Sequence, residues 1–200
     1  MKSCLGLFLA YLICLNLQAT PISAEDTVRE TTISVLERLN SERTRLEDNP
    51  MYIKEIVKEI IIPQFDFDKM AELVMEDYWN LLDSNKKTCF THAFKNLLVE
   101  RYAYVLLSYD NHTISYEPAK PIGELGYVSV RQIITREGAL PLPVDYPMHK
   151  TESGWRVVDL VIDGISLVKS YKNMFSIDAK IRGLDNFLET LPTCQYTDHE

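Results

Sequence analysis

The spacing of apolar residues changes twice along the chain, and these changes limit the folds open to it. From residue 25 to 109 apolar side chains recur every three or four positions, the period of amphipathic helices. From residue 112 to 163 they alternate with polar ones, as in half-buried strands, and after residue 164 the helical period returns. Helices, then a meander of strands, then helices predict an α+β fold whose antiparallel sheet is covered by helices on one face.

The helical part divides at polar and proline residues. We expect an amphipathic surface helix over 25–48 and a second helix that begins at Asn49-Pro50 and ends at Pro63. A short third helix should cover 65–83. A fourth should run from a cap at Ser84 to residue 109, with an unusually aromatic buried face.

Four strands are expected, over 112–117, 126–135, 140–150 and 154–163. The third shows the clearest alternation, with one face formed by Leu140, Leu142, Val144, Tyr146 and Met148. Prolines stand on its other face. Because proline cannot donate to a strand ladder, this strand is predicted to lie at an edge of the sheet or to be irregular at its ends.

The first 24 residues predict a signal peptide. Lys2 is followed by an apolar run from Leu5 to Leu17. The segment Ile22-Ser23-Ala24 then has the small residues typical of a signal-peptidase cleavage site. The run spans about 13 residues, whereas a helix that crosses a bilayer needs roughly 20. We expect 1–24 to be removed after Ala24, 25–192 to form a single α+β domain, and 193–200 to be a loose polar tail.

The charge balance excludes one class of partner. The full sequence has 21 basic and 29 acidic side chains, so the loss of Lys2 leaves 20 basic ones and a formal charge of −9. Nucleic acid needs a basic surface, and unaided adsorption to anionic lipid is disfavoured for the same reason. Any exchange with a membrane is therefore expected to pass through docking proteins.

Two cysteines, Cys89 and Cys194, remain after removal of the signal peptide. An oxidising compartment would allow them to pair. The alternative is a buried Cys89 and a free thiol on the tail, and the sequence leaves both open.

No catalytic or metal-binding constellation is found. The four histidines are scattered along the sequence, so they do not have the spacing of metal ligands. Gly164-Ile165-Ser166 resembles the start of a nucleophile elbow, but Val168 occupies the position where that motif requires a second glycine. Ser166 is better interpreted as a helix cap. Asp159 could act as a base if it faced the apolar side, but a buried aspartate more often accepts structural hydrogen bonds.

The segment over residues 154–168, GWRVVDLVIDGISLV, resembles a known family most specifically, through Trp155, Asp159 and the final Gly-Ile-Ser. Nearly the whole chain after residue 24 is similar to the periplasmic MlaC phospholipid-binding proteins, also called the toluene-tolerance auxiliary family. Supporting matches are Phe65-Asp66-Phe67, Met70-Ala71, Trp79, Tyr102 through Tyr109, Tyr146, Tyr171, Phe175 and Gly183-Leu184-Asp185. Two residues depart from the family pattern: Lys172 stands where the family often has arginine, and Pro147 where a basic residue is common. These departures put docking contacts in doubt more than the fold.

The resemblance implies a fold similar to the nuclear transport factor 2 class. In it a curved antiparallel sheet of four or slightly more strands is wrapped by helices around an apolar cavity. It implies a monomeric carrier with phospholipid as cargo and no cofactor, located in a Gram-negative periplasm. It also implies two docking partners: an inner-membrane ABC transporter with MCE domains, and an outer-membrane lipoprotein and porin complex. The direction of transport stays open.

The cavity wall is predicted from the buried faces of the helices and strands. The candidates are Phe67, Met70, Val74, Phe94, Leu98, Tyr102, Val105, Val144, Tyr146, Trp155, Val157, Val161, Ile165 and Val168. Arg131 and Lys172 are weaker candidates for a partner or a head group. Two alternatives to a lipid carrier remain, an enzyme of the same fold that uses Asp159 and a structural adaptor with a filled core.

Overall fold

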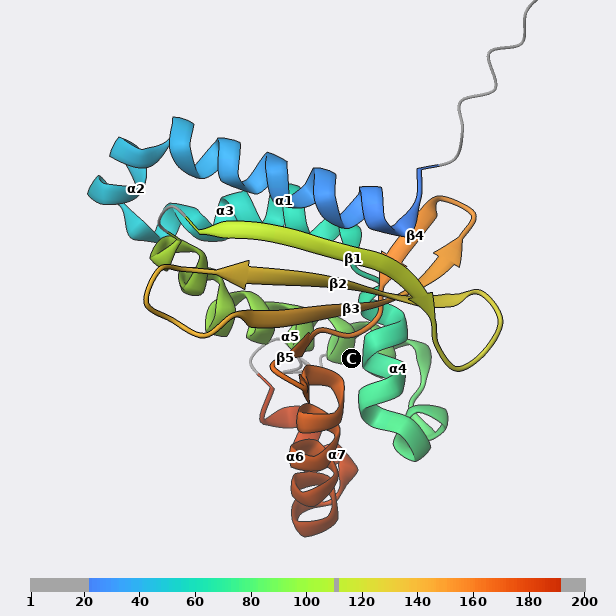
Figure 1. Ribbon diagram of the computed structural model, residues 1–200. Coiled ribbons are helices and arrows are strands. Elements are labelled where there is room, and N and C mark those ends of the chain that lie inside the picture. Colours follow the sequence, from blue (N-terminus) through green and yellow to red (C-terminus); the bar gives the residue numbers. More distant parts are fainter. Residues whose placement is uncertain (1–21, 110–111, 192–200) are drawn as a thin grey trace, which may run out of the picture.

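The computed structural model describes residues 22–109 and 112–191. An antiparallel sheet forms the middle of the molecule (Figure 1). The N-terminal helix runs along the sheet, and the last two helices extend away from it with the fourth α-helix beside them. The α+β class and the antiparallel sheet are therefore confirmed.

The α-helices occur where the apolar period is helical. They are α1 (Ala24–Ser41), α2 (Arg43–Asp48), α3 (Ile53–Ile56), α4 (Phe67–Met75), α5 (Ser84–Tyr102), α6 (Leu167–Arg182) and α7 (Leu184–Glu189). Shorter turns join them: 3₁₀ helices η1 (Pro50–Tyr52), η3 (Ile62–Gln64), η4 (Glu76–Leu81) and η5 (Ala103–Ser108), and a π turn η2 (Val57–Ile61).

Side-chain caps fix where the main helices begin. Ser23, Asp66, Asp83 and Ser166 each accept a hydrogen bond from the backbone N–H three residues later. The cap of α5 is thus Asp83 and not Ser84. The predicted cap at Ser166 is confirmed, which accounts for this serine without a catalytic role.

The sheet has six strands. They are β1 (Thr113–Pro121), β2 (Tyr127–Thr135), β3 (Leu142–Thr151), β4 (Gly154–Val157), β5 (Val161–Ile162) and β6 (Ile165–Ser166). Their order is β1-β2-β3-β5-β6, and β4 pairs with β3 beyond the end of β5. A register shift between Glu117 and Lys120 interrupts β1, as a β-bulge does.

The predicted edge position of the proline-rich strand is wrong, because β3 lies between β2 and the pair β4 and β5. The carbonyl oxygens of Pro147 and Pro143 accept from Val158 and Asp163 on the β4 and β5 side. In an antiparallel strand the N–H and C=O of one residue point to the same neighbour. The positions where proline lacks an N–H group therefore face β4 and β5, and the hydrogen-bond ladder between β3 and β2 is not affected.

The last predicted strand is split in two, and the split changes which side chains face inward. Val157 pairs with Met148 and Ile162 pairs with Val144, so the six residues 157–162 oppose the five residues 144–148. A shift of one residue reverses the alternation of faces. Val161 consequently points away from the side that Val157 and Ile162 share.

Aromatic rings fill the core of the helical lobe formed by α4 to α7. Phe90 and Phe94 stack with centroids 6.0 Å apart, and Phe175 meets both edge-on at 5.7 and 6.3 Å. Phe187 and Tyr171 complete the cluster. All five rings are buried in a packed cluster, and none of them lines the cavity described below.

The predicted signal peptide and tail lie mostly outside the described residues, and the cleavage after Ala24 stays a prediction. Cys89, on α5, is disulfide-bonded. The other cysteines of the sequence, Cys4, Cys14 and Cys194, lie outside the described residues. Pairing with Cys194 therefore also stays a prediction.

Replacing Phe94 with alanine should lower the free energy of unfolding by about 3–5 kcal/mol, because it leaves a void among rings that cannot close around it. Urea unfolding followed by circular dichroism measures the change. Ile177→Ala, on an exposed site of α6, is the control and should change the free energy by less than about 0.5 kcal/mol. A similar small loss for Phe94→Ala would contradict the packed-lobe description.

Candidate functional site

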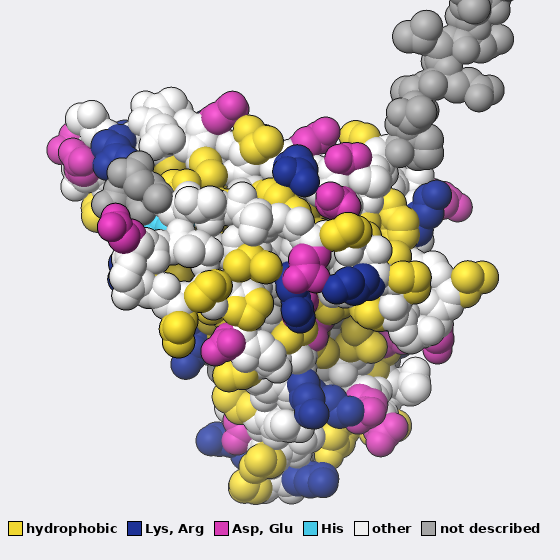
Figure 2. Space-filling model, viewed as in Figure 1, with side chains coloured by type: hydrophobic (Ala, Val, Ile, Leu, Met, Phe, Trp, Pro, Cys, Tyr) yellow, Lys and Arg dark blue, Asp and Glu magenta, His cyan; other side chains and the backbone are white. Residues whose placement is uncertain are grey.

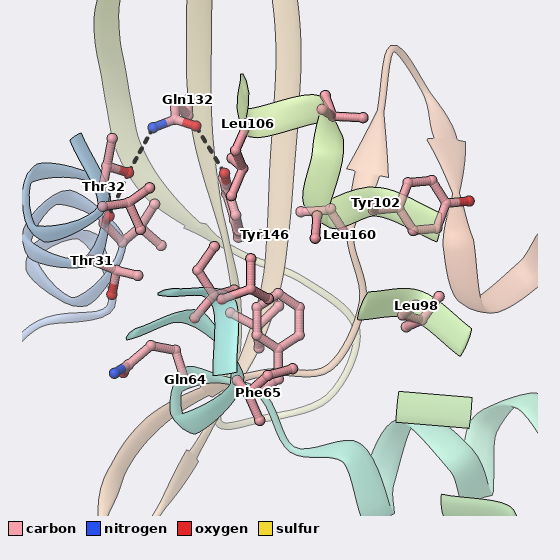
Figure 3. Close-up of a pocket in the computed structure, with 18 of the residues that line it drawn as sticks. Thr31, Thr32, Gln64, Phe65, Leu98, Tyr102, Leu106, Gln132, Tyr146 and Leu160 are labelled. Carbon is pink, nitrogen blue, oxygen red and sulfur yellow. Dashed lines mark hydrogen bonds between the residues drawn. The ribbon is translucent and has the colours of Figure 1, made fainter. Parts of the chain in front are cut away.

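An apolar cavity of about 320 Å³ lies between α1, the sheet and the turns that follow α3 and α5 (Figure 3). Its volume is within the range of roughly 300–1,000 Å³ usual for ligand pockets. None of its lining residues is charged. A space of this kind favours an apolar ligand.

Helix α1 supplies a continuous wall of the cavity. The residues of α1 that line the cavity are Thr27, Val28, Thr31, Thr32, Val35, Leu36 and Leu39. The threonine hydroxyls at positions 31 and 32 donate to carbonyl oxygens one turn earlier, which satisfies them within the helix. Their methyl groups then add to an apolar wall.

A polar cluster ties this wall to the sheet. Gln132, which is 2 % exposed, donates from Nε2 to Thr32 Oγ1 at 2.9 Å and to Tyr116 Oη at 3.2 Å. Its Oε1 accepts from Tyr146 Oη at 2.8 Å (Figure 3). Burial raises the pKa of Tyr146 well above its ordinary value, so this hydroxyl remains a donor at neutral pH. One side chain of β2 thus holds α1, β1 and β3 together.

The predicted cavity residues divide into two groups. Those that line the cavity are Phe67, Leu98, Tyr102, Val105, Tyr146 and Val157. Those that do not line it are Met70, Val74, Phe94, Val144, Trp155, Val161, Ile165 and Val168. The structure therefore brings fewer than half of the predicted residues together, and their contact with lipid stays a prediction.

The residues outside the cavity have identifiable positions. Met70, Val74, Phe94 and Val168 belong to the packed helical lobe. Val161 is turned away by the strand split, and Ile165 is 64 % exposed.

The apolar stripe of α5 serves two cores in succession. Phe90 and Phe94, in its first half, pack into the aromatic lobe, whereas Leu98 and Tyr102 line the cavity. Periodicity alone marks one buried face and does not distinguish a packed neighbour from a void.

The wall from α1 and η2 was missed, together with Gln132. The α1 wall could have been predicted from the threonine and aliphatic residues that recur at helical spacing in this segment. The segment is interpreted above only as an amphipathic surface helix. Gln132 interrupts an apolar strand segment. Nothing in the sequence indicates that its three partners surround it.

Asp159 is occupied by structural hydrogen bonds. Its Oδ1 accepts from the N–H groups of Leu160 at 2.7 Å and Val168 at 3.0 Å, and its Oδ2 accepts from Ser166 Oγ at 2.5 Å. The carboxylate therefore fixes the start of α6 against the loop before it. The structural interpretation of Asp159 accounts for all of these contacts.

The two basic residues singled out from the sequence are also engaged. Arg131 pairs with Asp145 through two hydrogen bonds, at 2.6 and 2.8 Å, and Lys172 Nζ lies 2.6 Å from Glu76. Within residues 22–109 and 112–191, no three His, Cys, Asp or Glu side chains are arranged to hold a metal ion. None of the helices in the same ranges is both long and apolar enough to cross a membrane.

Comparison with known proteins decides the family. The profile of the MlaC protein family matches residues 29–193. The chain belongs to the MlaC family. The family resemblance found in the sequence is thereby confirmed.

Two named relatives are identical to this MlaC-family chain at about a quarter of the aligned positions. The intermembrane phospholipid transport system binding protein MlaC of Haemophilus influenzae is 25 % identical over 154 residues, which cover 75 % of this chain and 72 % of the relative. The toluene tolerance protein ttg2D of Pseudomonas putida is 26 % identical over 161 residues, covering 80 % and 74 %.

A solved structure is similar throughout. It is a phospholipid-binding protein from Ralstonia solanacearum in complex with a phospholipid. The TM-score is 0.77 and the identity 26 %, and the match covers 86 % of this chain and 96 % of that one.

Replacing Gln132 with leucine should lower the free energy of unfolding by about 1–3 kcal/mol, because the buried Tyr146 hydroxyl then loses its acceptor. Thermal and urea unfolding measure this. Gln64→Leu is the control, since Gln64 also lines the cavity but is only half-buried. Equal effects of the two substitutions would show that the Gln132 cluster does not hold the wall.

Proposed function

We propose that this protein is a periplasmic carrier that binds one phospholipid and moves it between the outer and inner membranes, so maintaining outer-membrane lipid asymmetry. The observation that carries the proposal is the uncharged cavity between α1 and the sheet. The family membership supports it, as does the phospholipid in the similar Ralstonia structure.

The energetics of lipid transfer explain why a carrier needs such a cavity. Each methylene exposed to water costs about 0.8 kcal/mol, so two acyl chains with roughly 30 methylenes would cost on the order of 24 kcal/mol. A carrier must cover nearly all of this surface. A cavity whose described walls are uncharged and mainly aliphatic and aromatic can do so without leaving a charge buried.

The excess of acidic side chains bears on how the lipid enters and leaves. On the face shown in Figure 2 these side chains are interspersed with lysines and arginines and do not form one patch. At a formal charge of −9 without its first 24 residues, the protein gains no electrostatic attraction to an anionic bilayer. We therefore propose that loading and unloading occur at protein docks. The partners expected are an inner-membrane ABC transporter with MCE domains and an outer-membrane lipoprotein and porin complex.

Native mass spectrometry of protein purified from a periplasm, followed by extraction, should find one phospholipid per chain. Leu36→Trp places a larger side chain in the cavity and should displace two or three methylenes. At about 0.8 kcal/mol each, this lowers the affinity for lipid by roughly 10- to 60-fold.

The control is Ile33→Trp on the same helix, since Ile33 is 47 % exposed and does not line the cavity. It should retain lipid as the unmodified protein does. Protein that always arrives without lipid and takes none from vesicles would overturn the carrier proposal in favour of an adaptor.

A further inference from the structure

A second, more open hollow adjoins the apolar cavity. Three residues, Ile62, Phe65 and Phe67, line both spaces, and the two phenyl rings stack with centroids 5.7 Å apart. The rest of the hollow is polar and comes from the start of α4, one face of α5 and the β3–β4 hairpin. A molecule seated in the cavity could thus extend past the two rings into polar surroundings.

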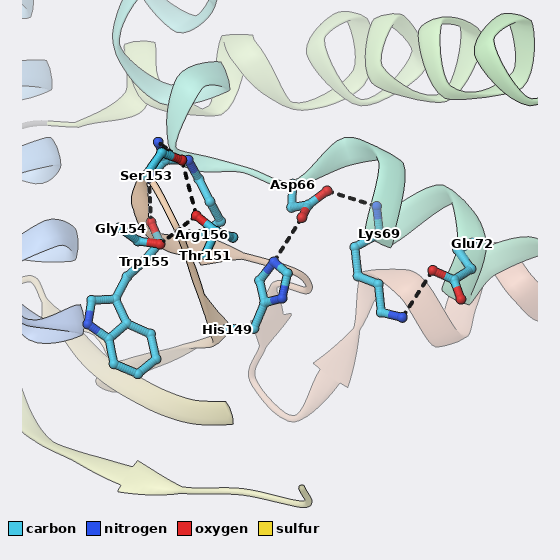
Figure 4. Close-up of polar contacts among 9 residues, drawn as sticks. All are labelled: Asp66, Lys69, Glu72, His149, Thr151, Ser153, Gly154, Trp155 and Arg156. Carbon is cyan, nitrogen blue, oxygen red and sulfur yellow. Dashed lines mark hydrogen bonds and ion pairs between the residues drawn. The ribbon is translucent and has the colours of Figure 1, made fainter. Parts of the chain in front are cut away.

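Two cations in this hollow have no acidic partner. Lys95 comes from α5 and Arg156 from the hairpin, and both are half-buried. Arg156 donates to Ser153 Oγ at 3.2 Å and to the carbonyl oxygen of Trp155 at 2.8 Å, which are neutral acceptors (Figure 4). Among the ion pairs of the described residues, none includes Lys95 or Arg156. This contrasts with Arg131 and Lys172, whose charges are already paired.

One buried hydroxyl in the hollow is left without a partner. Thr91 is 6 % exposed, lines the hollow, and its Oγ1 has no hydrogen-bond partner in the structure. Leaving a buried polar group unpaired costs about 1–3 kcal/mol. Thr88, one turn earlier on α5, adds a second hydroxyl to the same wall. Thr88 is exposed and presents its hydroxyl beside the two cations, whereas the Thr91 oxygen is covered by protein atoms.

The two carboxylates of the hollow differ in whether they already have hydrogen-bond partners. Asp66 is used internally: its Oδ1 accepts from the N–H of Lys69 at 2.9 Å, and its Oδ2 lies 2.8 Å from His149 Nε2 (Figure 4). Asp68 is exposed, and no partner is found for its carboxylate within the described residues. The hollow thus has unpaired charges of both signs, with the positive ones in excess.

We infer that this hollow binds the phosphate group of the lipid held in the cavity, through Lys95 and Arg156. The inference rests on the proposed carrier function. A phosphate diester is anionic and rich in acceptors, so it matches two cations whose charges are not paired with a carboxylate among the described residues. Asp68 lies where a cationic substituent on the phosphate would be favoured, which points to a zwitterionic head group.

The test compares two lipids with identical acyl chains, phosphatidylethanolamine and diacylglycerol, presented together in mixed vesicles to lipid-free protein. Mass spectrometry then measures which lipid is retained. The unmodified protein should prefer the phospholipid by about tenfold or more, since hydrogen bonds to charged groups contribute about 1.5–3 kcal/mol each. The double variant Lys95→Gln with Arg156→Gln should lose most of that preference while still holding either lipid.

Arg136→Gln with Lys180→Gln removes the same charge from exposed sites outside the hollow and should leave the preference unchanged. A double variant that keeps the preference of the unmodified protein, with an unchanged melting temperature, overturns the inference. So does equal retention of both lipids by the unmodified protein, although the carrier function would then stand. Retention of neither lipid would instead refute the carrier function itself.

Inorganic phosphate added to lipid-free protein in a calorimeter separates the two sources of the anion. Weak binding that depends on Arg156, together with the lipid preference, supports the head-group assignment. Arg156-dependent binding without any lipid preference would mean a site for free phosphate and would overturn it.

Discussion

An apolar cavity persists in a folded protein only where its walls cannot collapse onto one another, because unfilled space among apolar side chains is unfavourable. Here the walls are held from two directions. On one side the buried amide of Gln132 bonds Thr32 of α1, Tyr116 of β1 and Tyr146 of β3. On the other side the aromatic lobe anchors the first half of α5. The cavity is thus a consequence of a filled core beside it and a satisfied polar cluster within its wall.

The two interiors divide the requirements of a carrier between them. The lobe of α4 to α7 supplies stability through dense aromatic packing, and the space under α1 is free to accommodate an apolar ligand. Asp159 joins them, because its carboxylate fixes the start of α6 beside Leu160 and Leu167, both of which line the cavity. A residue that invites a catalytic interpretation therefore has a structural explanation.

The sequence predicted the order and type of most elements, because the period of apolar residues is a local property that follows from which face is buried. It located the site less well. Whether Phe94 meets a ring or a void depends on Phe175, some eighty residues later, and whether Val161 or Ile162 faces inward depends on one extra residue between β4 and β5. The central position of β3 was also missed. A proline removes a ladder hydrogen bond only on the side of the strand to which its nitrogen points, and the sequence does not tell which side that is.

The placement of those prolines has a further consequence for the mechanics of the sheet. On the β2 side, β3 has an unbroken ladder, whereas on the other side it meets two short strands and lacks the donors of Pro143 and Pro147. The seam between β3 and its C-terminal neighbours therefore has fewer paired residues than the β2 side of the same strand. Val157 and Ile162, both in the cavity wall, lie on that seam. The cavity is thus bordered by a discontinuous part of the sheet, where fewer ladder hydrogen bonds oppose a change in the volume of the side chains.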